Sequence, residues 1–147
     1  EENWDAIVLA AAGVKRLGYT DLITQRIPYD ICLPSVGQGA IGIEAREGDE
    51  AVLSILKSIS HKNTTLAVFA ERAFLRKLEG GCQIPIGALC QIDSKELVLE
   101  GMVASLDGTK MIRGKKRGSL FEPERLGEAL AEEFLARGAA AILAELE

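Results

Sequence analysis

Apolar and polar residues along this chain follow two kinds of pattern, a helical period and an alternation of every second residue. Between residues 63 and 78 the apolar positions recur at helical spacing, which predicts a buried amphipathic helix. The residues of that apolar face are Leu66, Phe69, Ala70, Ala73, Phe74 and Leu78. Gly80 and Gly81 follow after one residue, and a glycine just past the end of a helix is the usual left-handed cap. We therefore expect the helix to end there.

After this helix the pattern changes to that of β-strands. Apolar residues alternate in two runs, at residues 86–92 and 97–103. Asp107-Gly108 is a strong hairpin signal before a third strand at residues 111–117. Pro123 then opens a helix with an apolar stripe, and another helix is expected at residues 139–146. The stripe is Leu126, Leu130 and Phe134. A three-stranded antiparallel sheet covered by helices makes an α+β domain, which we place at residues 60–147.

Residues 1–59 contain shorter runs that predict the end of a strand and helix alternation. Residues 5–10 are apolar enough for a strand buried on both faces, as in a parallel sheet. The other predicted elements are short helices at 11–17 and 19–27, a strand or extended link at 29–33, a strand at 41–45 and a helix from Asp49 to Ile59. The last helix has a stripe of Val52, Ile55, Leu56 and Ile59, which we expect to be buried. A lone parallel strand has no sheet to join, so we expect a longer protein to complete these elements.

Composition restricts the class of protein. Apolar residues make up 48% of the 147 residues and charged residues 27%, which is typical of a globular protein with a real core. No apolar run approaches the ~20 residues of a membrane span, and the start has no signal-peptide features, so a cytoplasmic location is expected. The three cysteines form no Cys-x-x-Cys pair, and His61 is the single histidine, so neither a disulfide framework nor a metal site is expected.

Two motifs invite binding functions that their context does not favour. Arg113-Gly114-Lys115-Lys116-Arg117 is basic, but the net charge is -5, and lysines on an exposed strand edge discourage strand pairing between molecules. We interpret the run as such an edge and expect no nucleic-acid partner. Residues 37–42 match Gly-x-Gly-x-x-Gly. The dinucleotide fingerprint requires a helix at these glycines and an acid about 20 residues on, whereas here a strand pattern follows and residues 57–64 contain no acid.

Cys82 stands directly after the diglycine, which places its thiol on a loop between the predicted helix and the first strand. A catalytic thiolate needs a lowered pKa, and neither a helix C-terminus nor the nearby Glu79 favours the anion. An ordinary thiol would suffice for a single alkylation that leaves a permanent thioether. The alternative is a buried structural cysteine, because free cysteine is among the most buried residue types.

The segment around Cys82 resembles the cofactor-attachment motif of the hydroxymethylbilane synthase family, also called porphobilinogen deaminases. The matching residues are Glu71-Arg72, Phe74, Leu78, Gly80-Gly81-Cys82 and Ile84-Pro85-Ile86-Gly87. The resemblance extends through residues 5–13 and 33–40. The family's enzymes are roughly twice as long, so this chain resembles their C-terminal half.

The resemblance implies the chemistry of the site. Cys82 would carry a dipyrromethane cofactor as a thioether, and this cofactor would prime the stepwise joining of four porphobilinogen units, each losing ammonia. Arg16 would bind the acidic side chains of the cofactor or growing pyrrole chain, since a guanidinium holds a carboxylate with two parallel hydrogen bonds. Gln38 would lie near substrate and cofactor. The carboxylate that assists ammonia loss would precede Glu1, so no catalytic residue is assigned within this chain.

The resemblance also implies how the chain is divided. Residues 1–34 would end the second α/β domain, residues 35–59 would be a segment returning to the first, and both domains would be periplasmic-binding-protein-like. Residues 60–147 would be the cofactor-attachment domain. The implied partners are porphobilinogen, the growing pyrrole chain and the missing N-terminal half of the same enzyme, with no nucleic acid and no membrane. We expect the complete enzyme to be a monomer and this chain alone to be inactive.

Two alternatives from other classes stay open. The chain could be a stand-alone ligand-binding or interaction module derived from the cofactor domain, in which case Cys82 would carry no adduct. It could instead be an unrelated dinucleotide enzyme. Titration with NAD, followed by the fluorescence of Trp4, separates that alternative from the others.

Overall fold

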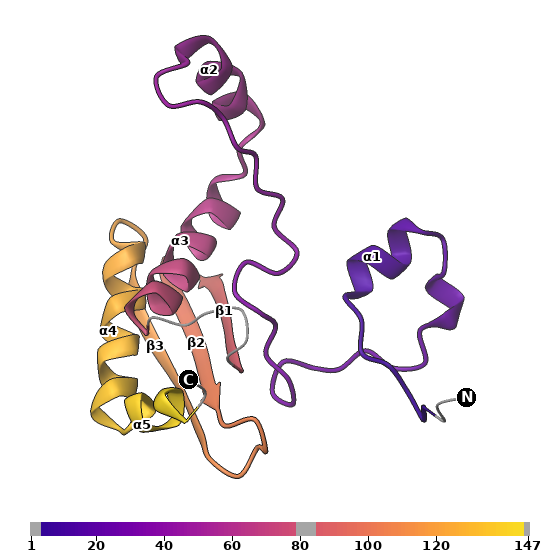
Figure 1. The fold of residues 1–147 in the computed structure, drawn as a ribbon. Coiled ribbons are helices and arrows are strands. Elements are labelled where there is room, and N and C mark those ends of the chain that lie inside the picture. The colour runs from indigo at the N-terminus through magenta and orange to yellow at the C-terminus, as the bar shows by residue number, and fades with distance from the viewer. Residues whose placement is uncertain (1–3, 79–84, 146–147) are drawn as a thin grey trace. The chain divides into compact units, whose positions relative to one another are not determined.

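A computed structural model describes residues 4–78 and 85–145 of the chain, which forms two compact units, Glu1–Cys32 and Leu33–Glu147. The first unit contains helix α1 (Ala11–Arg16) and the 3-10 helix η1 (Thr20–Leu22), as Figure 1 shows. Helix α1 confirms the short helix predicted at residues 11–17. The prediction of a longer helix at residues 19–27 is wrong, because only the single turn of η1 forms there. Residues 29–31 form a turn instead of a strand, with the N–H of Ile31 donating to the Pro28 carbonyl at 3.1 Å.

The strands predicted at residues 5–10 and 41–45 are absent from the described structure. Both segments are irregular, and their apolar side chains are exposed: Val8 is 76% exposed and Ile41 is 87% exposed. Backbone N–H and C=O groups form a strand only when a neighbouring strand accepts and donates their hydrogen bonds. No other described segment pairs with these residues, so the apolar pattern alone does not produce a strand.

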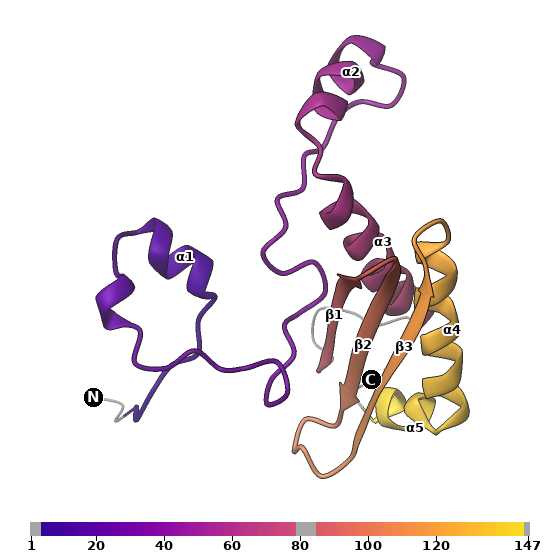
Figure 2. The same ribbon diagram turned by 180° about the vertical axis from the view of Figure 1, so that it is seen from behind.

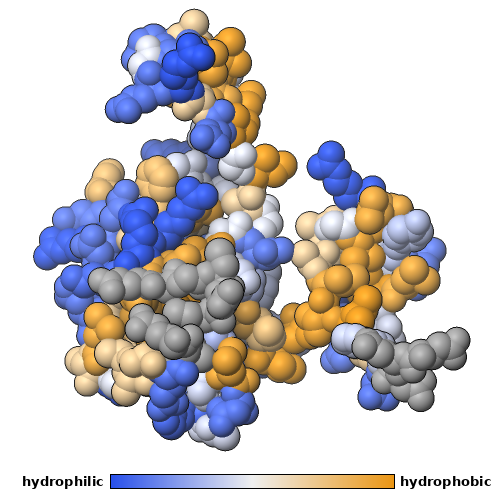
Figure 3. Space-filling model, viewed as in Figure 1, coloured by the Kyte–Doolittle hydropathy of each residue, from blue (hydrophilic) through white to orange (hydrophobic). Residues whose placement is uncertain are grey.

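Helix α2 (Glu50–Ile59) begins as predicted at Asp49, whose side chain accepts a hydrogen bond from the N–H of Val52 at 3.2 Å. The expectation that its apolar stripe is buried is wrong in this chain, since Ile55 is 65% exposed and Ile59 is 64% exposed. Figure 3 shows such apolar residues on the molecular surface. Among residues 4–78 and 85–145, no helix is long and apolar enough to cross a membrane.

The rest of the chain forms the predicted three-stranded antiparallel sheet, which confirms the α+β class of this part. The strands are β1 (Ile86–Asp93), β2 (Glu96–Ala104) and β3 (Met111–Ser119), in the order β1-β2-β3. Helices α3 (Lys62–Lys77) and α4 (Pro123–Ala136) cover one face of the sheet, as Figures 1 and 2 show from opposite sides. Helix α5 (Ala139–Ala144) follows Gly138 and packs against α4 and β2.

An aromatic pair occupies the centre of the layer between helices and sheet. Phe74 of α3 and Phe134 of α4 are fully buried, and their rings meet edge to face with centroids 5.2 Å apart. Gly101 of β2 pairs with Gly114 of β3 directly beneath them. A Cβ atom on Gly101 would lie 2.7 Å from the Phe74 ring, and one on Gly114 would lie 2.9 Å from the Phe134 ring. The paired glycines therefore make the space that the two rings fill.

Strand β3 is an edge strand of the sheet, which confirms our interpretation of the basic run. Arg113 donates to Glu100 on β2 through Nε at 2.9 Å and also pairs with it through its terminal nitrogen at 2.7 Å. Arg117 pairs with Asp93 at 2.9 Å, and Lys116 pairs with Glu133 of α4 at 3.3 Å. Carboxylates thus neutralise much of the run, and such exposed pairs each contribute little stability.

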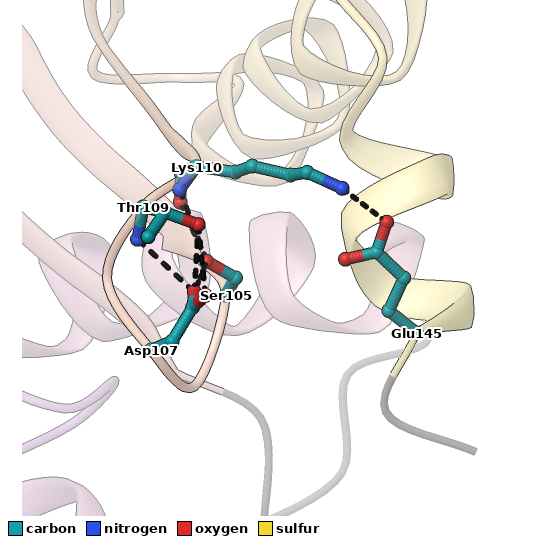
Figure 4. A network of polar contacts seen from close by, with 5 residues as sticks. All are labelled: Ser105, Asp107, Thr109, Lys110 and Glu145. Carbon is teal, nitrogen blue, oxygen red and sulfur yellow. Dashed lines mark hydrogen bonds and ion pairs between the residues drawn. The ribbon is translucent and has the colours of Figure 1, made fainter.

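The hairpin between β2 and β3 is closed by a network of short polar side chains, shown in Figure 4. The Asp107 carboxylate accepts hydrogen bonds from the hydroxyl of Ser105 at 2.6 Å and from the N–H of Thr109 at 3.1 Å. The N–H of Lys110 donates to the Ser105 hydroxyl at 3.0 Å, and its ammonium pairs with Glu145 after α5. The hydrogen bond from Ser105, followed by those from Thr109, lowers the pKa of Asp107 to about 2.

We expect Asp107→Asn to destabilise the domain near neutral pH and to differ less from the wild type in acid. The folded pKa of Asp107 is about 2, against about 3.9 for an unfolded aspartate. Its stabilising contribution is therefore present above about pH 4 and lost as the pH falls towards 2. Urea titrations of both proteins at several pH values measure this difference in the free energy of unfolding. Glu128→Gln removes a charge from an exposed site on α4 as a control. A difference that stays constant from neutral pH to pH about 2 would contradict the assignment.

Candidate functional site

Cys82, the predicted point of cofactor attachment, lies outside the described residues, as do the diglycine before it and the helix cap expected there. The structure describes what comes before and after this segment. Leu78 follows α3 and is 3% exposed, with its N–H donating to the carbonyl of Phe74 at 3.2 Å. After the segment, Pro85 precedes β1, which begins at the buried Ile86. Residues of the hydrophobic core therefore stand on both sides of the segment that contains Cys82.

Gln38, the second predicted site residue, lies exposed in a turn at residues 36–39. Gly37 has φ +71° and Gly39 has φ +84°, in the left-handed region that favours glycine. The N–H of Gln38 donates to the Ser35 carbonyl at 3.0 Å, and the N–H of Ala40 donates to the Gly37 carbonyl at 3.1 Å. The two glycines thus allow two successive tight turns that expose the amide side chain between them. No helix opens at these glycines in the structure, contrary to the dinucleotide fingerprint.

The segment before this turn is attached to β1 of the C-terminal domain. The N–H of Ala88 in β1 donates to the Pro34 carbonyl at 3.0 Å. Leu33 is 5% exposed, and a Cβ atom on Gly87 would lie 3.0 Å from the Leu33 Cβ. Gly87 therefore lets the segment approach the strand closely, and the turn that carries Gln38 belongs to the same compact unit as α3 and the sheet.

Glu71 connects these elements through its carboxylate. It lies on α3 and is only 6% exposed. One carboxylate oxygen accepts a hydrogen bond from the N–H of Gly37 at 2.8 Å, and the other accepts one from the N–H of Cys90 in β1, also at 2.8 Å. A single side chain therefore joins the turn of Gln38, strand β1 and the helix that leads towards Cys82.

Arg16, the third predicted site residue, is the last residue of α1 and is exposed. It belongs to the unit Glu1–Cys32, whereas Gln38 belongs to the unit that begins at Leu33. The structure thus places Gln38 in the unit Leu33–Glu147, whose range includes position 82, and places Arg16 in the unit Glu1–Cys32. Among the described residues, no group of three or more His, Cys, Asp or Glu side chains could hold a metal ion.

Comparison with known proteins assigns both parts of the chain to one family. Residues 65–136 match the family model described as "Porphobilinogen deaminase, C-terminal domain". Residues 1–54 match the one described as "Porphobilinogen deaminase, dipyromethane cofactor binding domain". The chain belongs to the porphobilinogen deaminase family. The family implied by the residues around Cys82 is thereby confirmed, and its cofactor is a dipyrromethane.

Curated porphobilinogen deaminases match almost the whole chain. The protein of Carboxydothermus hydrogenoformans is 55% identical over 146 residues, which cover 99% of this chain and 47% of that protein. The protein of Moorella thermoacetica is 56% identical over 142 residues, covering 97% and 45% of the two chains. That of Prochlorococcus marinus is 53% identical over 144 residues, covering 98% and 46%. The chain therefore spans about half the length of the curated porphobilinogen deaminases that it matches.

Three polar groups, on Glu71, Cys90 and His61, have structural roles. Burial raises the pKa of Glu71, and the N–H groups of Cys90 and Gly37 oppose that shift by stabilising the carboxylate. Burial, and secondarily the charge of Glu71, raises the pKa of Cys90 to about 12, so this thiol stays protonated. Cys90 is 5% exposed and belongs to the hydrophobic core. His61 caps α3, its Nδ1 lying 2.7 Å from the Thr64 hydroxyl.

Sequence reasoning gave Glu71 no role of its own, although Glu71 belongs to the segment on which the resemblance to the family was based. A signal was present in its position. Glu71 lies one residue after Ala70 and three before Phe74, so a carboxylate interrupts the apolar face of the predicted helix. A charged residue on a buried face requires hydrogen-bond partners. The pattern could therefore have indicated a buried carboxylate, but the two N–H groups that it binds are known only from the structure.

Proposed function

We propose that this chain is the C-terminal portion of a hydroxymethylbilane synthase, the transferase also called porphobilinogen deaminase. The complete enzyme would join four porphobilinogen molecules, each losing ammonia, on a dipyrromethane primer linked to Cys82. The observation that carries this proposal is the 55% identity over 146 residues to the porphobilinogen deaminase of Carboxydothermus hydrogenoformans. The motif from Glu71 to Gly87 supports it, because the residues around Cys82 match the family's attachment segment.

We propose the same division into domains that the resemblance implied. Residues 1–34 would end a second α/β domain, residues 35–59 would return to a first one, and both would be periplasmic-binding-protein-like. The exposure of Val8, Ile41 and Ile55 supports this division, since apolar side chains of this kind are normally covered by a partner surface. The preceding half of the enzyme would supply the strands and helices that cover them. Residues 60–147 would carry the cofactor.

The side chains that the chain offers suit the proposed cofactor. When bound, the dipyrromethane supplies the pyrrole end to which the substrate is joined. Arg16 presents an exposed guanidinium and Gln38 an exposed amide. Both donate hydrogen bonds, and a guanidinium in particular pairs with carboxylates such as those on the pyrrole rings. Cys82 would hold the group covalently, and the buried residues Leu78 and Ile86 would anchor the two ends of its segment.

The adduct on Cys82 is the decisive test. We expect the mass spectrum of the full-length protein to show a dipyrromethane on the peptide that contains Cys82 and on no other cysteine peptide. Cys82→Ser should abolish the adduct and the activity. Cys32→Ser removes an exposed cysteine and should leave both unchanged. An active enzyme whose Cys82 is unmodified would overturn the tether, and an inactive protein without adduct would favour a stand-alone binding module.

The 147-residue chain alone should not turn over, because the carboxylate that assists ammonia loss and several arginines would belong to the preceding half. Incubation of the purified chain with porphobilinogen, followed by detection of hydroxymethylbilane, measures this directly. The full-length protein serves as the positive control. Steady release of hydroxymethylbilane by the isolated chain would show that its own residues are sufficient and would overturn this part of the proposal.

A further inference from the structure

The edge of β1 that faces away from β2 is covered by a chain segment and a side-chain carboxylate. Among residues 4–78 and 85–145, β1 pairs with β2 along one edge and with no strand along the other, so its alternate N–H groups face away from the sheet. Two of them have partners outside the sheet: the N–H of Ala88 donates to the Pro34 carbonyl at 3.0 Å, and that of Cys90 donates to Glu71 at 2.8 Å. The segment from Pro34 to Gly37 thus lies along this edge, and Glu71 holds its far end.

Glu71 accepts hydrogen bonds from two backbone N–H groups, and other contacts hold these two groups in place to different degrees. Cys90 is paired with Leu99 of β2 and stays in place through the sheet. Gly37 lies in a turn, and its position depends on the bond from its N–H to Glu71 and on the contacts of the short segment before it. Loss of one carboxylate oxygen would therefore release the turn before it disturbed the strand.

We propose that Glu71 is a positioning residue, whose carboxylate holds the turn of Gln38 in a fixed place against α3 and β1 of the domain to which Cys82 belongs. This inference rests on the proposed function, because Gln38 and Cys82 matter together only if Cys82 carries the primer. Few atoms separate the Glu71 carboxylate from the backbone of Gln38. Gly37 precedes Gln38 directly, and Glu71 lies on the helix that ends at Lys77 and leads through the buried Leu78 to the segment of Cys82.

A carboxylate suits this position better than its amide analogue. Both donors are backbone N–H groups, and both carboxylate oxygens accept. In Glu71→Gln one oxygen becomes an NH2 group, which only donates, so two donors would face each other at one of the two sites. The substitution keeps the volume and the helix, and it removes one of the two bonds. We expect the lost bond to be that of Gly37.

Amide hydrogen exchange of the 147-residue chain tests the clamp itself. In the wild type, the N–H of Gly37 should exchange at least tenfold more slowly than that of Gly42, which lies in an irregular segment. In Glu71→Gln the Gly37 amide should lose this protection, while the amide of Leu99 in β2 keeps its own. Glu132→Gln, on an exposed carboxylate of α4, is the matched control and should change neither. If Gly37 exchanges as fast as Gly42 in the wild type, no clamp exists, whatever the variants do.

Kinetics of the full-length protein test the positioning role. Glu71→Gln should lower kcat by about tenfold to hundredfold, the scale of a small misplacement of a group at an active site. The adduct on Cys82 should stay as in the wild type, the variant should remain folded at the assay temperature by circular dichroism, and Glu71→Asp should restore part of kcat. An unchanged kcat with the adduct present would overturn the positioning role. Absence of the adduct from the wild type would instead overturn the proposed function, so the two failures are distinguishable.

Discussion

Gly127→Ala is expected to destabilise the C-terminal domain by about 3 kcal/mol or more, the upper range for overpacking a close contact. Gly127 lies in α4 where this helix crosses α3. A Cβ atom there would lie 2.2 Å from the carbonyl oxygen of Ala70 and 2.7 Å from the backbone nitrogen of Phe74. These are backbone atoms of a packed helix and cannot move away as a flexible side chain could. The helices would have to separate.

The sign of this effect opposes intrinsic helix propensity. Alanine in a helix interior is normally favoured over glycine by about 1 kcal/mol, so an uncrowded site would be stabilised. Urea unfolding followed by far-ultraviolet circular dichroism measures the outcome. Gly42→Ala is a control for the added Cβ alone, at a non-helical site, because no atom lies within 4 Å of that Cβ. If Gly127→Ala proved as stable as the wild type, the contact of α3 and α4 described here would be wrong.

Phe74→Ala should cost about 4 kcal/mol in the free energy of unfolding, as is typical for removal of a buried aromatic side chain. Phe74 is fully buried, and its ring contacts Phe134 edge to face. It also fills the space above Gly101, where the absence of a side chain leaves nothing to collapse into the cavity. The loss therefore combines the transfer of the ring to water with an unfilled cavity.

Phe121→Ala provides the control for this prediction. It is the same substitution at a residue that is 93% exposed, so its effect should stay within about 0.5 kcal/mol of zero. Thermal and urea unfolding of the two variants, measured in parallel, give the comparison. Equal stabilities would show that the ring of Phe74 is not at the centre of the core. Because domains of this size have about 5–15 kcal/mol of total stability, Phe74→Ala should also lower the yield of folded protein.

The accuracy of the sequence predictions follows from the range of the interactions that they depend on. Helices α3 and α4 and strands β1 to β3 were predicted within a few residues, because their apolar faces pack against one another within residues 60–147. The strands predicted at residues 5–10 and 41–45 did not form, and no described segment pairs with them. The helix at residues 50–59 formed anyway, since helical hydrogen bonds are internal to the segment.

The same distinction applies to the candidate site. The motif around Cys82 and the glycines beside Gln38 are local in the sequence and could be recognised there. The partners of Glu71 could not, because Gly37 and Cys90 are separated from it by 34 and 19 positions and come together only when the segment lies on β1.

The amino-acid sequence by itself determined the family, the class of the C-terminal domain and the identity of the candidate residues, because these depend on local motifs and periodic patterns. Only the tertiary structure decided which backbone groups the buried carboxylate of Glu71 binds and why three glycines, Gly101, Gly114 and Gly127, face other residues at close range. Such contacts are set by the packing of segments distant in the chain, and no local pattern of residues specifies them.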